Sequence, residues 1–169
     1  MAIITQPLRD EHQELFPHVE NLRTAGDSIT RSFISPTDRA NIDAAHEFLV
    51  NHLIPHAVAE EKALYPVVSK VMGASQATAT MSRDHVEIGR LTQELGDILS
   101  EVGGSIEEDQ ANALRQVLYG LYALVKVHFA KEEEIYLPLL DSRLSAAEAA
   151  EMFEAMEKAA HEAKSHLEH

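Results

Sequence analysis

The segment His56–Pro66, with the sequence HAVAEEKALYP, decides the fold because a close copy of it, HFAKEEEIYLP, occupies residues 128–138. In both copies, two glutamates stand four and five residues after a histidine, and a tyrosine and a proline follow them. Residues that are four apart lie close together on one face of an α-helix. Each copy therefore predicts a helix that presents a histidine and a glutamate side by side.

A second pair of similar segments precedes these copies, with RDEH at residues 9–12 and SRDH at residues 82–85. The histidine of the first segment precedes His56 by 44 residues, and that of the second precedes His128 by 43. The chain therefore contains one helical hairpin twice. Two such hairpins, packed with pseudo-twofold symmetry, would direct both sets of side chains to one point inside a bundle.

Apolar residues recur at spacings of three and four almost throughout the chain, and no segment alternates as a strand would. Gly73 is suited to a left-handed cap at the end of the second helix, and Ser105 and Ser145 each open a capping box with the glutamate three residues on. Pro17 and Pro55 should kink or interrupt their helices. The predicted helices cover residues 7–31, 36–72, 76–102, 105–138 and 145–166.

These long helices, joined by short connections, predict an all-α fold, an antiparallel up-down four-helix bundle with an extra C-terminal helix. We expect the bundle to occupy residues 1–142 and the extra helix, residues 143–166, to pack on its outside. The last three residues, Leu167-Glu168-His169, resemble the start of an expression tag.

Composition excludes several classes of function. The chain has 28 acidic and 14 basic residues, a formal charge of −14, which disfavours nucleic acid and anionic membranes as partners. It has no cysteine, so disulfides, thiolate metal sites and cysteine nucleophiles are excluded. The longest apolar run has nine residues and the N-terminus lacks the pattern of a signal peptide. We expect a cytoplasmic protein that is a monomer or a weak homo-oligomer.

Histidines and carboxylates that converge inside a bundle need a positive charge beside them, because a buried charge costs several kcal/mol unless it is paired or coordinated. Mixed nitrogen and oxygen ligands contributed by four helices favour two octahedral iron ions, with two histidines on each and two bridging glutamates. Manganese and zinc are the weaker alternatives. The predicted metal ligands are His12, His56, Glu60, His85, His128 and Glu132.

The segments DEHQELF at residues 10–16, NHLIPHAVAEEKALYP at 51–66, SRDHVEI at 82–88 and VHFAKEEEIYLP at 127–138 resemble the hemerythrin-like, or HHE cation-binding, domain family. The resemblance extends over about residues 5–140. It implies a four-helix bundle with a non-haem di-iron centre, oxo- or hydroxo-bridged, that binds or reacts with O2, peroxide or nitric oxide.

The sequence departs from the oxygen-carrying hemerythrins, which use five histidines. His85 has Met81 four residues before it and Gly89 four after it, so the fifth histidine is missing. The last helix offers both Glu132 and Glu133, and the internal repeat favours Glu132. With four histidines, roughly two of about twelve coordination positions stay open, which favours reaction over reversible storage.

Whether the protein is an enzyme stays open at this stage. The alternatives are a ferroxidase or peroxide-consuming di-iron enzyme, and an iron–sulfur cluster repair factor.

Several residues near the predicted ligands have simpler expected roles. We expect Glu61 and Glu133 to lie on an acidic outer face, or else to hydrogen-bond a ligand imidazole. Tyr65 and Tyr136 are expected to pack at the end of the bundle, or else to hydrogen-bond a bound oxygen species. His52 is expected to be a half-exposed histidine, with a role as a further ligand or a hydrogen-bond donor to one as the alternative. His18, His46, His161 and His166 are expected to bind no metal. The predicted apolar wall of the site consists of Leu15, Phe16, Phe48, Ile88 and Phe129.

Overall fold

The computed structural model describes residues 3–30 and 32–167 of the chain, and within these ranges the regular structure is helical. One isolated antiparallel bridge, between Phe33 and Ser105, joins two loops. The α-helices are α1 (Gln6–Asp27), α2 (Pro36–Phe48), α3 (Ile54–Ala59), α4 (Tyr65–Met72), α5 (Ala79–Glu101), α6 (Glu108–Lys131), α7 (Leu137–Arg143) and α8 (Ala146–Ser165).

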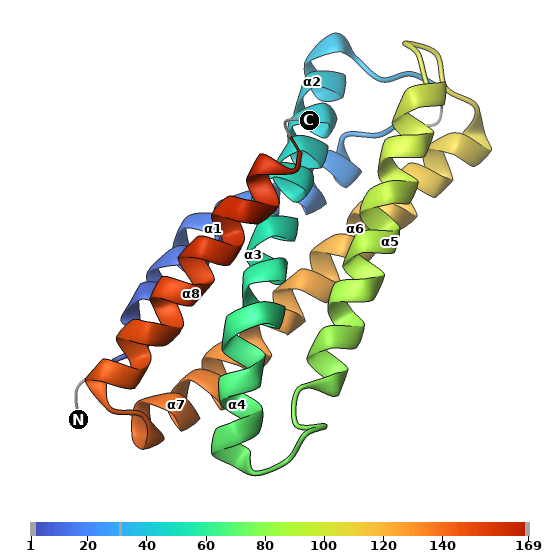
Figure 1. Cartoon of the computed structure of the whole chain (residues 1–169). Coiled ribbons are helices and arrows are strands. Elements are labelled where there is room, and N and C mark those ends of the chain that lie inside the picture. Colours follow the sequence, from blue (N-terminus) through green and yellow to red (C-terminus); the bar gives the residue numbers. More distant parts are fainter. Residues whose placement is uncertain (1–2, 31, 168–169) are drawn as a thin grey trace.

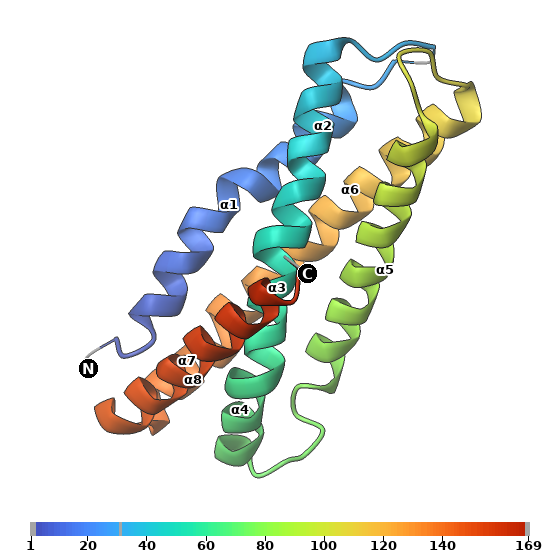
Figure 2. The same cartoon turned by 45° about the horizontal axis from the view of Figure 1, so that its top comes forward.

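Four long rods form an antiparallel bundle, as Figures 1 and 2 show. The first rod is α1, the second runs through α2, α3 and α4 without a break, the third is α5, and the fourth runs through α6 and α7. Helix α1 packs on α2 and α6, and α5 packs on the same two helices from the other side. The predicted all-α bundle with an extra C-terminal helix is therefore confirmed.

Two helix termini, the end of α4 and the start of α8, lie where the sequence predicts them. Gly73 has a φ of 65° and ends α4 in the left-handed region, as expected of a residue without a Cβ atom. Ser145 begins α8 with a capping box that includes Glu148. Helix α1 stops at Asp27, before the predicted residue 31, and the hydroxyl of Ser28 donates to the carbonyl of Ala25 there. Residue 31 itself lies outside the described residues.

The predicted capping box at Ser105 is wrong. Helix α6 begins three residues later, with Glu107 as its N-cap and Gln110 as the reciprocal partner. The reason is tertiary, because the backbone at Ser105 bridges to Phe33, and the amide of Ile106 donates to a carbonyl of the same loop. These contacts hold the segment extended, so the helix cannot start there.

Three short π-helical turns interrupt the α-helices: η1 (Leu49–Leu53), η2 (Glu60–Leu64) and η3 (Glu132–Tyr136). Each precedes a proline by two residues: Pro55, Pro66 and Pro138 respectively. Proline has no amide hydrogen, and its ring clashes with the carbonyl four residues earlier, so a widened turn accommodates it.

Two of these turns begin at the glutamates of the repeated motif, Glu60 and Glu132. In both, the residue before the proline donates its amide hydrogen to the carbonyl of that glutamate, five residues back. The prediction that Pro55 interrupts a helix is therefore correct, whereas α1 continues through Pro17 as one helix.

The apolar interior consists of two clusters with a polar layer between them. Leu8 belongs to one cluster and Leu15 to the other, and His12 lies between them on α1. Met81 and Ile88 flank His85 on α5 in the same way. Burying a leucine or methionine side chain contributes about 1.5–3 kcal/mol, so both clusters stabilise the fold on either side of the polar layer.

Helix α8 lies across the outside of the second rod, where it contacts α3 and η2 (Figure 2). Its apolar face buries Met152, Met156 and Ala159. The division into a bundle at residues 1–142 and a separate C-terminal helix stays a prediction, because α8 shares its apolar cluster with the bundle. Of the predicted tag remnant, residues 168 and 169 lie outside the described residues.

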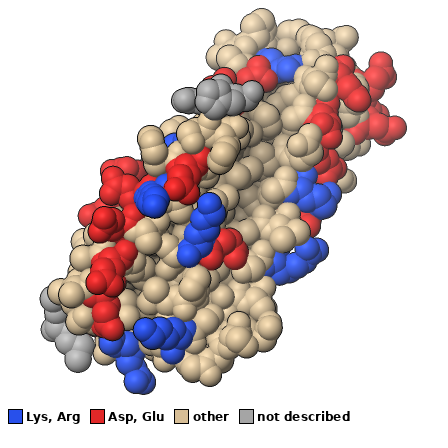
Figure 3. Space-filling view, viewed as in Figure 1, with Lys and Arg blue, Asp and Glu red and all other residues tan. Residues whose placement is uncertain are grey.

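The face in Figure 3 shows acidic side chains gathered along one edge and at the opposite upper corner, with Lys and Arg between them. Within residues 3–30 and 32–167, no helix combines the length and the apolar character that crossing a membrane would require.

Candidate metal centre

All six residues predicted as metal ligands meet in one cluster within the bundle. Each of the four rods contributes, so the cluster forms only when the two hairpins pack. The contributing elements are α1 (His12), α3 (His56), η2 (Glu60), α5 (His85), α6 (His128) and η3 (Glu132). The two glutamate side chains have no exposed surface, and three of the histidines are buried, while His85 is half-buried.

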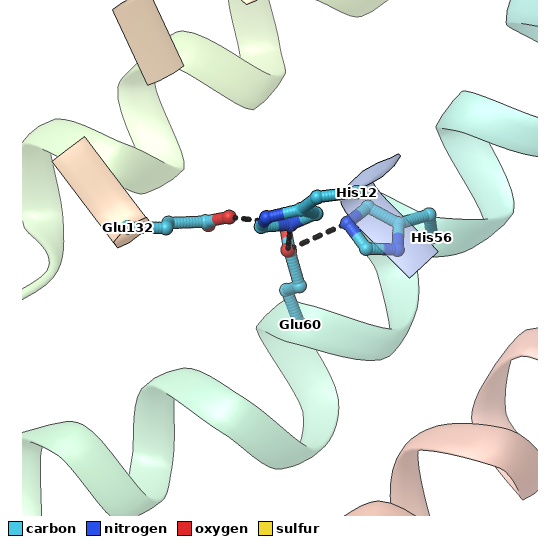
Figure 4. A group of neighbouring side chains, drawn as sticks. All are labelled: His12, His56, Glu60 and Glu132. Carbon is cyan, nitrogen blue, oxygen red and sulfur yellow. Dashed lines mark ion pairs between the residues drawn. The ribbon is translucent and has the colours of Figure 1, made fainter. Parts of the chain in front are cut away.

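The carboxylate of Glu60 lies between two pairs of histidines. Its Oε1 atom is 2.8 Å from Nε2 of His56 and 3.9 Å from Nε2 of His12. Its Oε2 atom is 3.0 Å from Nε2 of His85 and 3.8 Å from Nε2 of His128. Figure 4 shows Glu60 reaching the first of these pairs. One carboxylate therefore faces both pairs, one oxygen to each.

Glu132 also contacts one histidine of each pair. Its Oε2 atom is 3.1 Å from Nε2 of His12, and its Oε1 atom is 3.1 Å from Nε2 of His128. The cluster thus has two halves, which we name the His12–His56 half and the His85–His128 half. The His12–His56 half with both glutamates, and the His85–His128 half with Glu60, each bring their ligand atoms close enough to hold a metal ion.

Several atoms of this cluster have no hydrogen-bond partner in the described part of the chain. They are Nε2 of His12, Nε2 of His56, both carboxylate oxygens of Glu60, and Oε2 of Glu132. Some of these atoms approach one another closely, but in directions that make no hydrogen bond. Orphaned buried polar groups are rare in proteins because each costs about 1–3 kcal/mol. A cation placed among them would satisfy these atoms together.

The outer nitrogen of each imidazole is held by a carboxylate. Such a contact fixes the orientation of a ligand ring, leaves its other nitrogen free to bind a metal, and raises the basicity of the ring. The Nδ1–carboxylate pairs are His12 with Glu133 (2.8 Å), His56 with Glu11 (2.9 Å), His85 with Glu61 (2.7 Å) and His128 with Asp84 (2.9 Å).

The sequence pattern indicated these supporting carboxylates only in part. Glu61 and Glu133 were expected chiefly on the outer face, and the structure instead shows the alternative, a contact with an imidazole. Glu11 and Asp84 were missed. The signal was present, because an acidic residue directly precedes the lone histidine in both copies of the hairpin. The sequence did not show which group each acidic residue contacts. Packing brings Glu11 to His56 and Asp84 to His128, the second histidine of the same copy in each case.

The buried carboxylates of the cluster favour the protonated, positively charged form of the histidines beside them. Burial disfavours the charged form of His12, but the carboxylates of Glu132 and Glu60 outweigh this effect and raise its pKa to about 9. The same balance of burial and carboxylates raises the pKa of His128 to about 10, and that of His56 well above its ordinary value. Without metal, protons thus supply the positive charge that the carboxylates require.

Tyr65 and Tyr136 are offset by one position in the repeat, since Tyr65 aligns with Leu137 and Tyr136 with Leu64, and their surroundings differ. The hydroxyl of Tyr65 donates to Oε1 of Glu132 at 2.8 Å and lies 3.2 Å from Nε2 of His128 and 3.4 Å from Nε2 of His85. Of the two expectations for Tyr65, packing at the end of the bundle is therefore wrong, and its hydroxyl lies at the cluster, as the alternative requires. Tyr136 donates to a backbone carbonyl, that of Ala77.

An apolar wall covers the His12–His56 half. The ring of Phe129 stacks on His12 with 4.3 Å between centroids and meets His56 edge-on at 6.0 Å. Leu15, Phe48 and Ile88 are buried in the adjoining apolar cluster, as predicted. Phe16 was expected there as well, but it is exposed and lies beneath the ammonium group of Lys126.

The other histidines among the described residues lie outside the cluster. His52 is exposed, although it stands four residues before His56 on the same rod. His18 stacks on Phe48, and His46 lies against Gly96, where a Cβ atom would come within 2.9 Å of its ring. His161 and His166 are exposed on or next to α8.

Comparison with known families agrees with this geometry. Residues 4–140 match the family model described as the hemerythrin HHE cation binding domain. The chain belongs to this family of cation-binding four-helix domains, and the match ends before α8. No curated protein and no solved structure matches the chain significantly.

Proposed function

We propose that this protein binds two iron ions in the His–Glu cluster and that the iron binds or reacts with O2, peroxide or nitric oxide. The observation that carries the proposal is the set of five buried, unpartnered atoms among His12, His56, Glu60 and Glu132. These atoms lie close together, and because a carboxylate holds Nδ1 of each histidine, Nε2 is the nitrogen that each offers to a metal.

Two ions fit the cluster better than one. Each glutamate directs its two oxygens to different halves, which is the arrangement of a bridging carboxylate. A structural zinc site needs four ligands, whereas this cluster offers six residues of mixed nitrogen and oxygen type, which suits two six-coordinate iron ions. Iron supplies the redox change and the ligand-binding positions that such small molecules require.

Four histidines and two glutamates leave positions free for an external ligand. The two halves differ in what surrounds these positions, since Phe129 covers the rings of the His12–His56 half and the Tyr65 hydroxyl lies at the His85–His128 half. We place the external ligand at the His85–His128 half, where Tyr65 can donate a hydrogen bond to it. The apolar wall keeps water from the other half.

A second candidate function is enzymatic: a ferroxidase or a peroxide-consuming di-iron protein. The Tyr65 hydroxyl favours it over simple storage, because a hydrogen-bond donor beside an exchangeable position can assist a reaction. Oxidation of added Fe(II), or release of O2 from peroxide at steady state, would support this candidate. A stable oxygenated form that loses O2 under vacuum would identify a carrier instead.

Metal analysis of the purified protein tests the proposal directly. We expect about two iron ions per chain and near-ultraviolet absorption bands, and the reduced protein should react with O2, peroxide or nitric oxide in stopped-flow experiments. Glu60→Gln should lose at least ten-fold in metal affinity, because a ligand that serves both halves is weakened. His52→Ala is the matched control, since it removes an exposed histidine from the same rod and should leave metal binding unchanged. One zinc ion per chain, or equal metal loss in both variants, would overturn the proposal.

A further inference from the structure

Two cations break the symmetry of the repeat around the candidate metal centre. Three residues before the lone histidine, the first copy has Arg9 and the second has Ser82. Directly before the glutamate of the His–Glu pair, the first copy has Ala59 and the second has Lys131. Each copy therefore carries one basic residue, at a position where the other copy has a neutral one.

Arg9 forms an ion pair with Glu133, the carboxylate that contacts His12. Its NH1 group contacts Oε2 of Glu133 at 2.6 Å, while Oε1 of the same carboxylate contacts the imidazole. The guanidinium is itself held by Asp141 at 3.3 Å and by the hydroxyl of Thr5 at 3.3 Å. At the equivalent place in the second copy, Ser82 donates a neutral hydrogen bond of 2.8 Å to Glu61.

Lys131 forms an ion pair with Asp84, the carboxylate that contacts His128. Its ammonium group contacts Oδ2 of Asp84, the same oxygen that faces Nδ1 of the imidazole. In the first copy the corresponding carboxylate is Glu11, which holds His56. In the described ranges, no lysine or arginine forms an ion pair with Glu11 or with Glu61.

The result is the same in both halves of the cluster. Among the described residues, a lysine or arginine pairs with one supporting carboxylate in each half: Glu133, which contacts His12, and Asp84, which contacts His128. A carboxylate makes the imidazole it contacts more basic. A cation on the carboxylate weakens this effect, and such charges act strongly in a poorly solvated interior.

We infer that Arg9 and Lys131 are positioning residues that cancel the charge of Glu133 and Asp84 and thereby set the reduction potential of the two halves. This inference rests on the proposed function, because it concerns the metal ions that the cluster would hold. With a cation behind one imidazole in each half, the reduced state of the metals is favoured.

Arg9→Gln and Lys131→Gln test the inference in the iron-loaded protein by spectroelectrochemistry. Removing a positive charge favours the oxidised metal, so each variant should shift the reduction potential to lower values, and the double variant should shift it further. Arg9→Lys should restore the potential. The controls are Arg90→Gln, which removes a cation paired with Glu87 and Glu94 on the exposed face of α5, and Lys126→Gln on α6. Neither control variant should shift the reduction potential.

Two double variants distinguish an effect of charge on the reduction potential from a loss of structural support. Glu133→Gln in the Arg9→Gln background, and Asp84→Asn in the Lys131→Gln background, return the local charge to its original value. We expect the potential to move back toward that of the unaltered protein. In the single variants Arg9→Gln and Lys131→Gln, which keep Glu133 and Asp84, the affinity for Co(II), a metal probe that undergoes no redox change here, should fall by less than the roughly ten-fold that loss of a supporting carboxylate causes.

The outcomes distinguish this inference from the proposed function. Potentials that stay unchanged in both single variants, or that are not restored by the second substitution, overturn the inference while leaving two-metal binding intact. A chain that binds no metal overturns both. If Arg9→Gln does not fold because Asp141 loses its partner, Lys131→Gln still provides the test, since Lys131 forms no ion pair apart from Asp84 in the described chain.

Discussion

The hydroxyl of Tyr65 donates a hydrogen bond of 2.8 Å to Oε1 of Glu132, although 67 positions separate the two residues in the chain. Tyr65 is the first residue of α4, after the π turn that begins at Glu60, and Glu132 begins the equivalent turn of the second copy. The contact thus joins the two hairpins at the candidate centre. It also differentiates the two halves, since Tyr136 makes no such contact there.

Tyr65→Phe should leave the fold intact and change the reactivity of the centre. The ring stays, so the free energy of unfolding should fall by about 1.5–3 kcal/mol, the value of one hydrogen bond to a charged group. The visible spectrum of the iron-loaded protein and its rate of reaction with peroxide or O2 should change. Tyr136→Phe is the control, because its hydroxyl contacts a backbone carbonyl, and an equal spectral change in both variants would contradict the role of Tyr65.

Phe129→Ala should destabilise the protein strongly and open the His12–His56 half to water. Loss of a buried phenylalanine costs about 3–5 kcal/mol, because apolar contacts are lost and a cavity remains. Urea unfolding measures this cost. Phe16→Ala removes the same side chain from a place on α1 where it is 41% exposed and has a cation–π contact with Lys126, and this variant should cost clearly less. Similar costs in the two variants would show that Phe129 is not part of the wall.

The metal-free protein should lose stability as the pH rises. The pKa values of His12 and His128, about 9 and about 10, lie above the ordinary value of 6.5. Their protonated forms therefore stabilise the folded chain fully below pH 6.5, and this contribution is lost as the pH rises through 9 to 10. The melting temperature, measured after treatment with a chelator, should fall over this interval.

Metal should reverse that trend, because metal ions compete with protons for the same nitrogens. The stabilisation by bound metal, taken as the difference in melting temperature with and without chelator, should grow from pH 6.5 to pH 9. His52→Ala, which leaves the cluster unchanged, should show both trends. A metal-free protein that is more stable at pH 9 than at pH 6.5 would contradict the charge balance described for the cluster.

Helix α8 should behave as an integral part of the fold. Met156 is buried in the apolar cluster that also includes Leu64 and Leu137 of the bundle. Met156→Ala should reduce the free energy of unfolding by about 2–5 kcal/mol, and the transition should stay single. Met72→Ala, at the exposed end of α4, should have little effect. A biphasic transition would instead support a separable C-terminal helix.

The sequence alone determined the class of fold and the six residues of the cluster. Periodic apolar residues predicted the helices, because burial of one face depends on a spacing that is visible in one dimension. The repeated histidine and glutamate revealed the cluster for the same reason, since a spacing of four always places two side chains together on a helix. The internal repeat was therefore sufficient to predict Glu60 and Glu132 as a matched pair.

Only the tertiary structure decided which groups surround those six. Glu11 supports His56 and Arg9 supports Glu133 across distances of 45 and 124 residues, and no local spacing predicts such contacts. Tyr65 and Tyr136 follow their glutamates by five and four residues, so the sequence already separates them around the helix, but the group that each hydroxyl contacts is visible only in the structure. The physical reason is that helical periodicity fixes the face on which a side chain lies. The partner it meets depends on how the rods rotate and slide as they pack.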